Sequence, residues 1–280
     1  MILNVTIIEL IKIITKFLKK QLFVSIFIGL VLFVGLIALI KLPLRKSTTV
    51  YATVKLSQGF WWANTSNPGI WFLEALKKGE KEYDLLSRPI AEITSIRYYY
   101  QETNLDFNQF DIYLSVKLSV EDNGNKGYMF KRAKIAVGSP MDMDFTNSQV
   151  TGTIVALDVK KSDPVYIEKN ITLTKKFAFP WEYEAIKIGD RYFNGEENVF
   201  EIIDKQAFDT LTITSDAYGN ILPQVQELRK YIIVKAKIKL TKNSFNQFIF
   251  GEEQVIKINS YANLTTNNMV LSDFNVASLD

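Results

Sequence analysis

Two stretches, WFLEALKKGE (Trp71–Glu80) and WEYEAIKIGD (Trp181–Asp190), decide how this chain of 280 residues is organised. They align without a gap and share five identities and two conservative exchanges over ten positions. Four further pairs of segments match in the same order: Val54–Phe60 with Ile171–Phe177, Ala91–Ile93 with Phe200–Ile202, Ile112–Val120 with Ile232–Leu240, and Tyr128–Phe130 with Phe248–Phe250. The chain is therefore predicted to contain a tandem duplication, with copy one at residues 47–160 and copy two at residues 161–280. Each copy is too long for a solenoid repeat and has the size of a small domain.

Each copy is predicted to be built of β-strands. In residues 112–120 and 234–240 apolar and polar side chains alternate, which is the period of a strand with one buried face. Asn123-Gly124 then marks a hairpin, because both central positions of a tight turn need positive φ. Further strands are expected at 50–57, 90–99, 132–138 and 150–158, and helices in copies one and two only at 71–78 and 223–229. The predicted fold is mainly β: an N-terminal transmembrane helix followed by two tandem homologous small β-barrel or β-sandwich domains.

Residues 1–46 are predicted to form an amphipathic segment and a membrane anchor. Leu22–Ile40 contains nineteen residues without a charge. As a helix it would span roughly 28 Å, close to the hydrocarbon thickness of a bilayer. The run is longer than the apolar core of a secretory signal, and it ends in Lys41, Arg45 and Lys46 instead of a small-residue cleavage site. We therefore expect a retained single-pass anchor.

The segment before the anchor has an amphipathic pattern. Glu9, Lys12, Lys16, Lys19 and Lys20 stand among isoleucines, leucines and a phenylalanine. The pattern is typical of a helix in the headgroup layer with its lysines toward anionic lipid. A single long helix over residues 3–40, part of it partner-binding, explains it equally well. Four basic residues before the anchor against three after it favour a cytoplasmic N-terminus, which places residues 47–280 outside the cytoplasm.

Composition excludes several classes of function. The chain has 33 basic and 30 acidic residues, of which seven basic residues and one acid lie in residues 1–46. Residues 47–280 therefore carry 26 basic and 29 acidic residues, a net charge of −3, and lack the basic surface of a nucleic-acid-binding protein. Neither cysteine nor histidine is present. Disulfides, thiol catalysis, histidine triads and the usual zinc and haem sites are thereby excluded, so we expect no enzyme, no cofactor and no metal ion.

The repeated block allows a functional and a structural interpretation. Its members are Trp71, Glu74, Lys77 and Gly79 in copy one and Trp181, Glu184, Lys187 and Gly189 in copy two. As a functional motif, the glutamate and lysine would form a repeated binding pair. As a structural motif, the tryptophan would plug the end of a barrel, a helical turn would place glutamate and lysine on one face, and the glycine would end it in a left-handed conformation. We favour the structural interpretation, because both copies retain the block while their surfaces differ.

Phe60, Trp61 and Trp62 form the candidate binding site. They open a seven-residue insertion that copy two lacks. Adjacent tryptophans on a loop could contact a membrane surface, stack on a sugar or anchor a partner subunit. A core position for at least one of them fits the sequence equally well. Asp142 and Asp144 share a face of an expected strand, but they supply too few oxygen ligands for Ca²⁺.

Several short motifs together resemble a known kind of protein. They are the N-terminal anchor, the repeated Ala-Ile-Lys-x-Gly-Asp entry, and Ile135–Pro140 ahead of a strand at Gly152–Val155. In these the chain resembles uncharacterised bacterial families of single-pass membrane-anchored extracytoplasmic tandem β-domain proteins. Copy two departs at Lys257–Ser260, where the Gly-x-Pro turn is lost. The resemblance implies a cell-membrane location and transfers no catalytic residue.

Two functions of different classes are compatible with these features. The first is a non-enzymatic, membrane-anchored structural or adaptor subunit of a bacterial cell-envelope assembly. Its partners would be the lipid bilayer and other envelope proteins or further copies of the chain. The second is an extracytoplasmic ligand-binding module that recognises glycan or peptide through Trp61 and Trp62. An envelope hydrolase is disfavoured, because no two residues of the sequence can be identified as a general acid and a general base.

Overall fold

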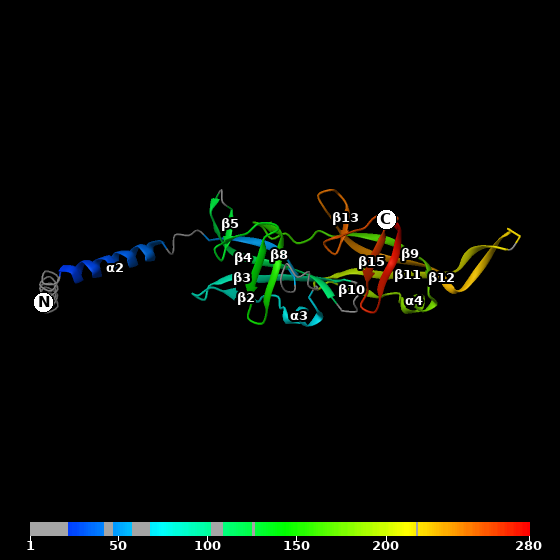
Figure 1. Ribbon diagram of the computed structural model, residues 1–280, viewed down its shortest axis with the longest axis horizontal. Coiled ribbons are helices and arrows are strands. Elements are labelled where there is room, and N and C mark those ends of the chain that lie inside the picture. The colour runs from blue at the N-terminus through cyan, green and yellow to red at the C-terminus, as the bar shows by residue number, and fades with distance from the viewer. Residues whose placement is uncertain (1–21, 42–46, 58–67, 102–108, 125–126, 217) are drawn as a thin grey trace.

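The structure is a computed structural model that describes residues 22–41, 47–57, 68–101, 109–124, 127–216 and 218–280. Over these residues the chain is mainly β, as predicted, and its strands form two curled, barrel-like sheets. Figure 1 shows the sheets beside each other along the long axis, with a two-stranded hairpin that projects beyond copy two.

The helices and strands follow one another in the same order in both copies. Copy one contains β1 (Ser47–Ser57), α3 (Ile70–Ala75), β2 (Lys81–Tyr83), β3 (Pro89–Gln101), β4 (Gln109–Asp122), β5 (Tyr128–Phe130), β6 (Ala133–Lys134), β7 (Pro140–Asp144) and β8 (Gln149–Asp158). Copy two contains β9 (Ile167–Ala178), α4 (Pro180–Ala185), β10 (Arg191–Phe193), β11 (Asn198–Ser215), β12 (Ile221–Lys242), β13 (Phe248–Phe250), β14 (Gln254–Val255), β15 (Tyr261–Thr265) and β16 (Val270–Leu279). The helix α2 (Leu22–Lys41) precedes both.

The two sheets share one topology. Copy one has the strand order β2-β3-β4-β1-β8-β7, and copy two has the order β10-β11-β12-β9-β16-β15. A small hairpin extends from the matching strand in each copy, since β5 pairs with β4 and β6, and β13 pairs with β12 and β14. The same order, with the same side pairings, is what a duplicated domain produces.

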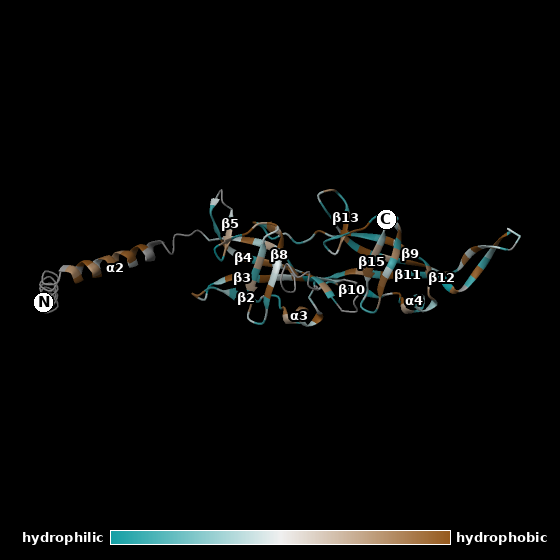
Figure 2. Ribbon diagram, in the orientation of Figure 1, coloured by the Kyte–Doolittle hydropathy of each residue, from teal (hydrophilic) through white to brown (hydrophobic). Residues whose placement is uncertain are grey.

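Alternation of side chains builds the two cores. In β4, Ile112, Leu114, Val116 and Leu118 are all fully buried, while Lys117 between the last two is exposed. Figure 2 shows the same alternation of apolar and polar residues along the other long strands. Because the sheets are curled, the apolar face of each one closes on itself and removes its side chains from water. Each Å² of apolar surface buried in this way contributes roughly 25 cal/mol.

The strand register corrects one part of the sequence alignment. Val54 pairs with Leu114 and Ile154, whereas Leu173 pairs with the equivalent residues Val234 and Val276. Val54 is therefore equivalent to Leu173, and aligning Val54–Phe60 with Ile171–Phe177 is wrong by two residues. A shift of two keeps every side chain on the same face of the strand, so the apolar alternation could not reveal it.

One cross-strand pair shows how the two cores diverged. Met141 lies opposite Gly152 in copy one, and the equivalent residues Ala262 and Phe274 lie opposite each other in copy two. All four are buried. A large residue faces a small one in each copy, but the sizes are exchanged between the strands. Both arrangements fill their cores, which close packing requires.

The turn before β7 survives in copy two, although its sequence pattern does not. Gly138 has a φ of +88°, and the equivalent Asn259 has a φ of +64°. The Gly138 N–H donates to the Ile154 carbonyl oxygen at 2.7 Å, and the Asn259 N–H donates to that of Val276 at 2.8 Å. Asparagine enters the left-handed region more easily than other residues with a side chain. The Gly-x-Pro pattern is therefore lost without loss of the turn.

Two expected elements differ from the structure. Residues 223–229, expected to be helical, lie in β12, where Pro223 pairs with Ile213 and Val225 with Leu211. Pairing with β11 overrides a weak helix propensity. Residues 132–138, expected to be a strand, contain only β6, because Arg132 and Gly138 adopt positive φ and interrupt the extended backbone.

The helix α2 covers the segment predicted to be the anchor, and the side chains of Phe23, Phe27 and Leu32 are exposed on it. Over the residues that the structure describes, no helix is long and apolar enough to cross a membrane. The segment with Lys12, Lys16, Lys19 and Lys20 lies outside the described residues. The membrane anchor therefore stays a prediction.

We expect Gly152→Ala to destabilise copy one. A Cβ atom at this position would lie 2.5 Å from the Lys55 carbonyl oxygen and 2.6 Å from Val54 Cγ1, so the strands must shift apart. Overpacking of this kind costs about 1–3 kcal/mol, and thermal unfolding should begin at a lower temperature. Thr151→Ala, on the exposed face of the same strand, is the control. Equal unfolding temperatures for the two variants would contradict the packing described for Gly152.

Candidate partner-binding surfaces

The repeated block lies on the outside of each sheet. Trp71 on α3 and Trp181 on α4 are each 62% exposed. The expectation that these tryptophans plug the end of a barrel is therefore wrong. The buried residue next to each helix is an aliphatic one, Leu76 or Ile186. The two tryptophans are therefore surface side chains at equivalent places.

The glutamate and lysine of the block do not form a binding pair. Glu74 and Lys77 are exposed, as are Glu184 and Lys187. Each helix ends at the alanine before the lysine, so glutamate and lysine do not share a helical face. Within the described structure no ion pair joins the glutamate of either block to its lysine.

The two glycines of the block occupy a tight turn. Gly79 and Gly189 have φ of +88° and +89°, the left-handed conformation expected from the sequence. Their N–H groups donate to the carbonyl oxygens of Ile93 and Ile202, each at 2.8 Å. The turn thereby fixes the chain to the neighbouring strand just before β2 or β10 begins.

Phe60, Trp61 and Trp62, the candidate site proposed from the sequence, lie outside the described residues. Within the described residues, two other surfaces are candidates for docking. One is the contact between copy one and copy two, and the other is the hairpin of copy two that lacks such a contact.

The end of β3 docks on copy two through backbone hydrogen bonds. The Tyr98 N–H donates to the Asn194 carbonyl oxygen at 2.9 Å. The Tyr192 hydroxyl donates to the Tyr98 carbonyl oxygen and accepts from the Tyr100 N–H, both at 3.1 Å. Tyr98 and Tyr100 of copy one are thus held by β10 and the turn that follows it.

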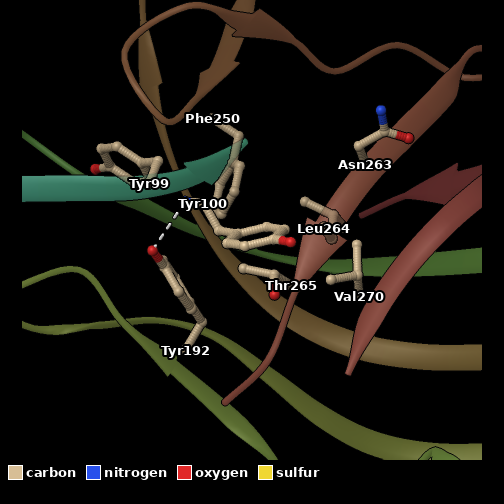
Figure 3. Close-up of a pocket in the computed structure, with 8 residues that line it drawn as sticks. All are labelled: Tyr99, Tyr100, Tyr192, Phe250, Asn263, Leu264, Thr265 and Val270. Atoms are coloured by element: carbon tan, nitrogen blue, oxygen red, sulfur yellow. Dashed lines mark hydrogen bonds between the residues drawn. The ribbon is translucent and has the colours of Figure 1, made fainter. Parts of the chain in front are cut away.

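Tyr99 enters the core of copy two. It is 7% exposed and belongs to the same buried cluster as Phe200, Ile238 and Phe250. The Asn194 amide donates to its hydroxyl at 3.1 Å, and its ring contacts that of Phe250 edge-on, with centroids 5.8 Å apart. Burial raises the pKa of Tyr99 far above its ordinary value, so the hydroxyl stays protonated. Figure 3 shows Tyr99, Tyr100 and Phe250 around a small pocket that Leu264 and Val270 close from the other side.

Glycine permits this close approach. Gly195 has a φ of +100°, and a Cβ atom there would lie 2.4 Å from the Ile96 carbonyl oxygen and 2.9 Å from the Tyr98 ring. A Cβ atom at Gly251 would meet the Tyr99 ring at 3.2 Å. The two copies therefore touch backbone to backbone, which leaves no room for a side chain at the first of these positions.

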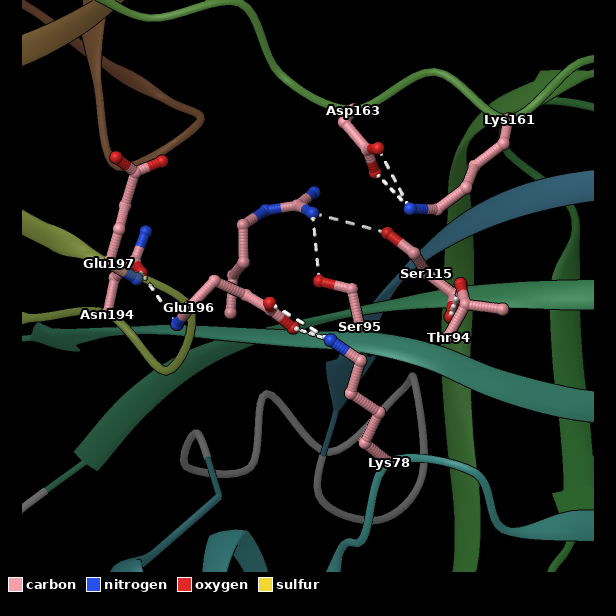
Figure 4. Close-up of polar contacts among 10 residues, drawn as sticks. Lys78, Thr94, Ser95, Ser115, Lys161, Asp163, Asn194, Glu196 and Glu197 are labelled. Atoms are coloured by element: carbon pink, nitrogen blue, oxygen red, sulfur yellow. Dashed lines mark hydrogen bonds and ion pairs between the residues drawn. The ribbon is translucent and has the colours of Figure 1, made fainter.

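Ion pairs surround the contact, with the positive charge always on copy one. Arg97 Nε bonds to Glu252 Oε1 at 2.8 Å, and Lys55 Nζ to Glu253 Oε1 at 2.6 Å. Lys78 Nζ lies 3.1 Å from Glu196 Oε2, and Figure 4 shows these two side chains meeting from opposite copies. The interface is thus basic on one side and acidic on the other.

The acidic side of the interface stays ionised. Burial opposes ionisation of Glu196, but hydrogen bonds led by that from Lys78 outweigh it, so its pKa lies below the ordinary value. Burial also opposes ionisation of Glu253, but the hydrogen bonds from Lys55 and Tyr113 and the charge of Lys55 together outweigh it, so the pKa of Glu253 is likewise lowered. Both carboxylates are therefore available as partners for the lysines at neutral pH.

No described residue of copy one docks on the corresponding hairpin of copy two. The register makes Phe208 of β11 equivalent to Tyr99 of β3, yet Phe208 is exposed. Beyond it, β11 and β12 continue as the two-stranded ribbon that projects in Figure 1. We call residues 207–230 the arm.

The arm has one apolar and one polar face. Residues opposite each other in an antiparallel pair share a face. Leu211 lies opposite Val225, Ile213 opposite Pro223, and Ser215 opposite Ile221, which gives a stripe of exposed aliphatic side chains. The other face carries Thr210, Thr212, Thr214, Gln224 and Gln226, together with the exposed Leu222 and, at the base of the arm, Phe208. An apolar stripe on an isolated ribbon is a docking surface by its chemistry.

No metal-binding arrangement accompanies these surfaces in the described residues. No group of three or more Asp or Glu side chains there could hold a metal ion. Glu82 is buried, and burial raises its pKa despite its ion pair with Lys131. Comparison of the chain with protein-family models, curated proteins and solved structures gives no match.

The docking surfaces left only a weak signal in the sequence. Burial alternates through Tyr98, Tyr99 and Tyr100 as in an ordinary strand, so the pattern does not indicate that all three touch copy two. The apolar stripe of the arm could have been found from Leu211, Ile213 and the polar threonines between them, since the alternation there continues for a whole strand. Because residues 223–229 were expected to be helical, the sequence did not indicate that they form the second strand of the arm.

We expect Gly195→Ala to loosen the contact between the copies. The new Cβ atom would collide with the backbone at Ile96, in addition to the strain of a left-handed alanine. Amide exchange at Tyr98 and Tyr100, whose N–H groups donate to copy two, should accelerate at least about 10-fold, equivalent to about 1.4 kcal/mol of lost protection.

Gly219→Ala is the matched control. Its φ of +83° brings the same backbone strain, but no atom lies within 4 Å of the new Cβ. Equal exchange rates at Tyr98 in the two variants would show that the close approach at Gly195 does not hold the copies together.

Proposed function

We propose that this chain is a non-enzymatic, membrane-anchored structural or adaptor subunit of a bacterial cell-envelope assembly. The observation that carries the proposal is the arm, whose apolar stripe has no partner within the described part of the chain. Monomeric soluble proteins rarely expose a continuous apolar surface without a use for it. Binding another protein is the use that fits an extended two-stranded ribbon.

The joined copies support a holding role. Backbone hydrogen bonds, the buried Tyr99 and three ion pairs connect copy one to copy two. A joint of this kind presents the arm at a defined place relative to copy one. A rigid scaffold with a protruding docking element is suited to positioning partners.

The anchor and its orientation complete the proposal. Leu22–Ile40 would cross the cell membrane once, with the N-terminus in the cytoplasm and residues 47–280 outside it. The argument is the length of the uncharged run and the lysines that precede it.

Protease treatment of spheroplasts tests the orientation. Added protease should digest residues 47–280 before the membrane is lysed, because they are exposed on the outer side. A cytoplasmic marker protein that survives until lysis is the control for membrane integrity. If residues 47–280 survive together with the marker, the proposed orientation is wrong.

Native mass measurement of the full chain in mild detergent tests the function. A stoichiometric complex, with other envelope proteins or with further copies, is the expected result. Replacing Trp61 and Trp62 with alanine should leave that complex intact if the arm makes the contact, and should weaken it if these residues are the binding site. A lone monomer, or a complex lost only in the tryptophan variant, would contradict the proposal and favour a ligand-binding module.

A further inference from the structure

Resting on the proposed function, we propose that the arm binds a second copy of this chain, at the turn that joins β2 to β3 in copy one of that molecule. The contact would repeat between molecules what the end of β3 already does within one molecule. We argue it from the equivalence of the two copies, the two exposed surfaces and the charges they carry.

The contact inside the chain is the precedent. There the end of β3 covers the turn between β10 and β11, and Asn194 in that turn is fully buried. Each copy of the duplicated domain therefore has a docking element, which we call its donor edge: the end of β3 in copy one and the arm in copy two. Each copy also has a turn that can receive such an element, which we call its acceptor turn: the turn after β2 in copy one and the turn after β10 in copy two. One donor and one acceptor meet within the chain, and over the residues that the structure describes the other two have no partner.

The free acceptor turn, residues 84–88, is one residue longer than the occupied one, residues 194–197, but a side chain at the same position shapes both. The Asp84 carboxylate accepts from the N–H groups of Leu86 and Arg88 at 2.8 and 2.9 Å. In copy two, the Asn194 side-chain oxygen accepts from the N–H groups of Glu196 and Glu197 at 3.0 and 2.9 Å. The same side-chain position thus shapes both turns.

The free acceptor turn exposes apolar side chains where the occupied turn is covered. Leu85 at its tip is fully exposed, and Leu86 and Tyr83 beside it are exposed as well. Leu85 follows Asp84 as Gly195 follows Asn194, so a backbone contact as close as that at Gly195 is ruled out here. The leucines would instead pack on aliphatic side chains, and Ile213 on the arm is 77% exposed.

Charge decides which donor fits which acceptor. In copy two, Glu252 pairs with Arg97. The equivalent residue of copy one is Arg132, since Glu252 has a φ of +71° and Arg132 a φ of +70° in matching turns. Arg97 would be repelled by Arg132, whereas the residue equivalent to Arg97 on β11 is the neutral Gln206. Residues 206–228 contain three acids and neither Lys nor Arg, and the only basic residues of the arm, Arg229 and Lys230, stand at its base, where Lys230 pairs with Asp209. That charge suits Lys131 and Arg132 of copy one, of which Lys131 pairs with Glu82 on β2, and disfavours an anionic lipid surface.

The proposed contact is head-to-tail, because the donor belongs to copy two and the acceptor to copy one. Figure 1 shows the arm and the β2–β3 turn at opposite ends of the paired sheets. A molecule that gives its arm to one neighbour can therefore receive the arm of another. Heterologous contacts of this kind produce a ring when the rotation closes and a filament when it does not.

Cysteine cross-linking of the full chain in mild detergent tests the proposal. The chain has no native cysteine, so introduced thiols report alone. By analogy with the approach of Gly195 to Tyr98, Leu85→Cys on one molecule should lie near Ala207→Cys on another. The double variant with a short bismaleimide should give a ladder of dimers, trimers and larger species. A mixture of the two single variants should stop at dimers, and each single variant alone should give none.

Matched variants on the two faces of the arm provide the second measurement. Ile213→Asp places a charge on the apolar stripe and should weaken self-association at least about 10-fold. Thr214 follows Ile213 in the sequence but lies on the opposite face. Thr214→Asp adds the same charge there and should change self-association less than about 3-fold. Circular dichroism of both variants should match the unmodified chain, which separates lost docking from lost folding.

Several outcomes would overturn the proposal. Cross-linked dimers of Ala207→Cys alone would show a symmetric arm-to-arm contact. Protection of that cysteine by lipid vesicles without any cross-linking would assign the arm to a membrane surface. A chain that never self-associates but purifies with another envelope protein would end self-docking while leaving the proposed function standing. A chain that stays monomeric without any partner would end both.

Discussion

The insertion of Tyr99 into the core of copy two is the contact on which the arrangement of this molecule depends. A linker alone would leave two similar domains free to move relative to each other. Instead the tyrosine ring fills a place among Phe200 and Phe250, and its neighbours bond to the turn after β10. The cost of moving the copies apart is therefore the cost of opening a hydrophobic core and leaving buried polar groups unpaired. The ion pairs around it add direction, because copy one supplies every positive charge.

Duplication followed by divergence explains why one domain type plays two roles. Tyr192, whose hydroxyl holds the end of β3, has Glu82 as its equivalent in copy one. Glu82 is turned into its own copy and paired with Lys131. The exchange of Met141 and Gly152 for Ala262 and Phe274 shows the same tolerance in the cores, where total volume is kept while its distribution changes. Strand order was conserved, and the surfaces were free to specialise.

The sequence predicted the β-rich fold well, and it predicted the surfaces poorly for physical reasons. Apolar alternation identifies buried faces, so β4 and β12 were aligned residue for residue. The same period cannot detect a slip of two residues, which is why Val54 was aligned with Ile171 instead of Leu173. It also cannot tell whether an alternating strand such as residues 207–215 faces its own core, a partner or water. Left-handed asparagine at residue 259 kept a turn that a search for glycine and proline would miss.

The shared core also implies an order of folding. The second hydrophobic cluster contains Tyr99 and Tyr113 from copy one together with the apolar residues of copy two. Copy two therefore cannot complete its interior until the β3–β4 hairpin is in place, whereas the core of copy one is built from its own residues alone. Because synthesis proceeds from the N-terminus and domains tend to fold as they emerge, the finished first domain serves as a template on which the second one closes.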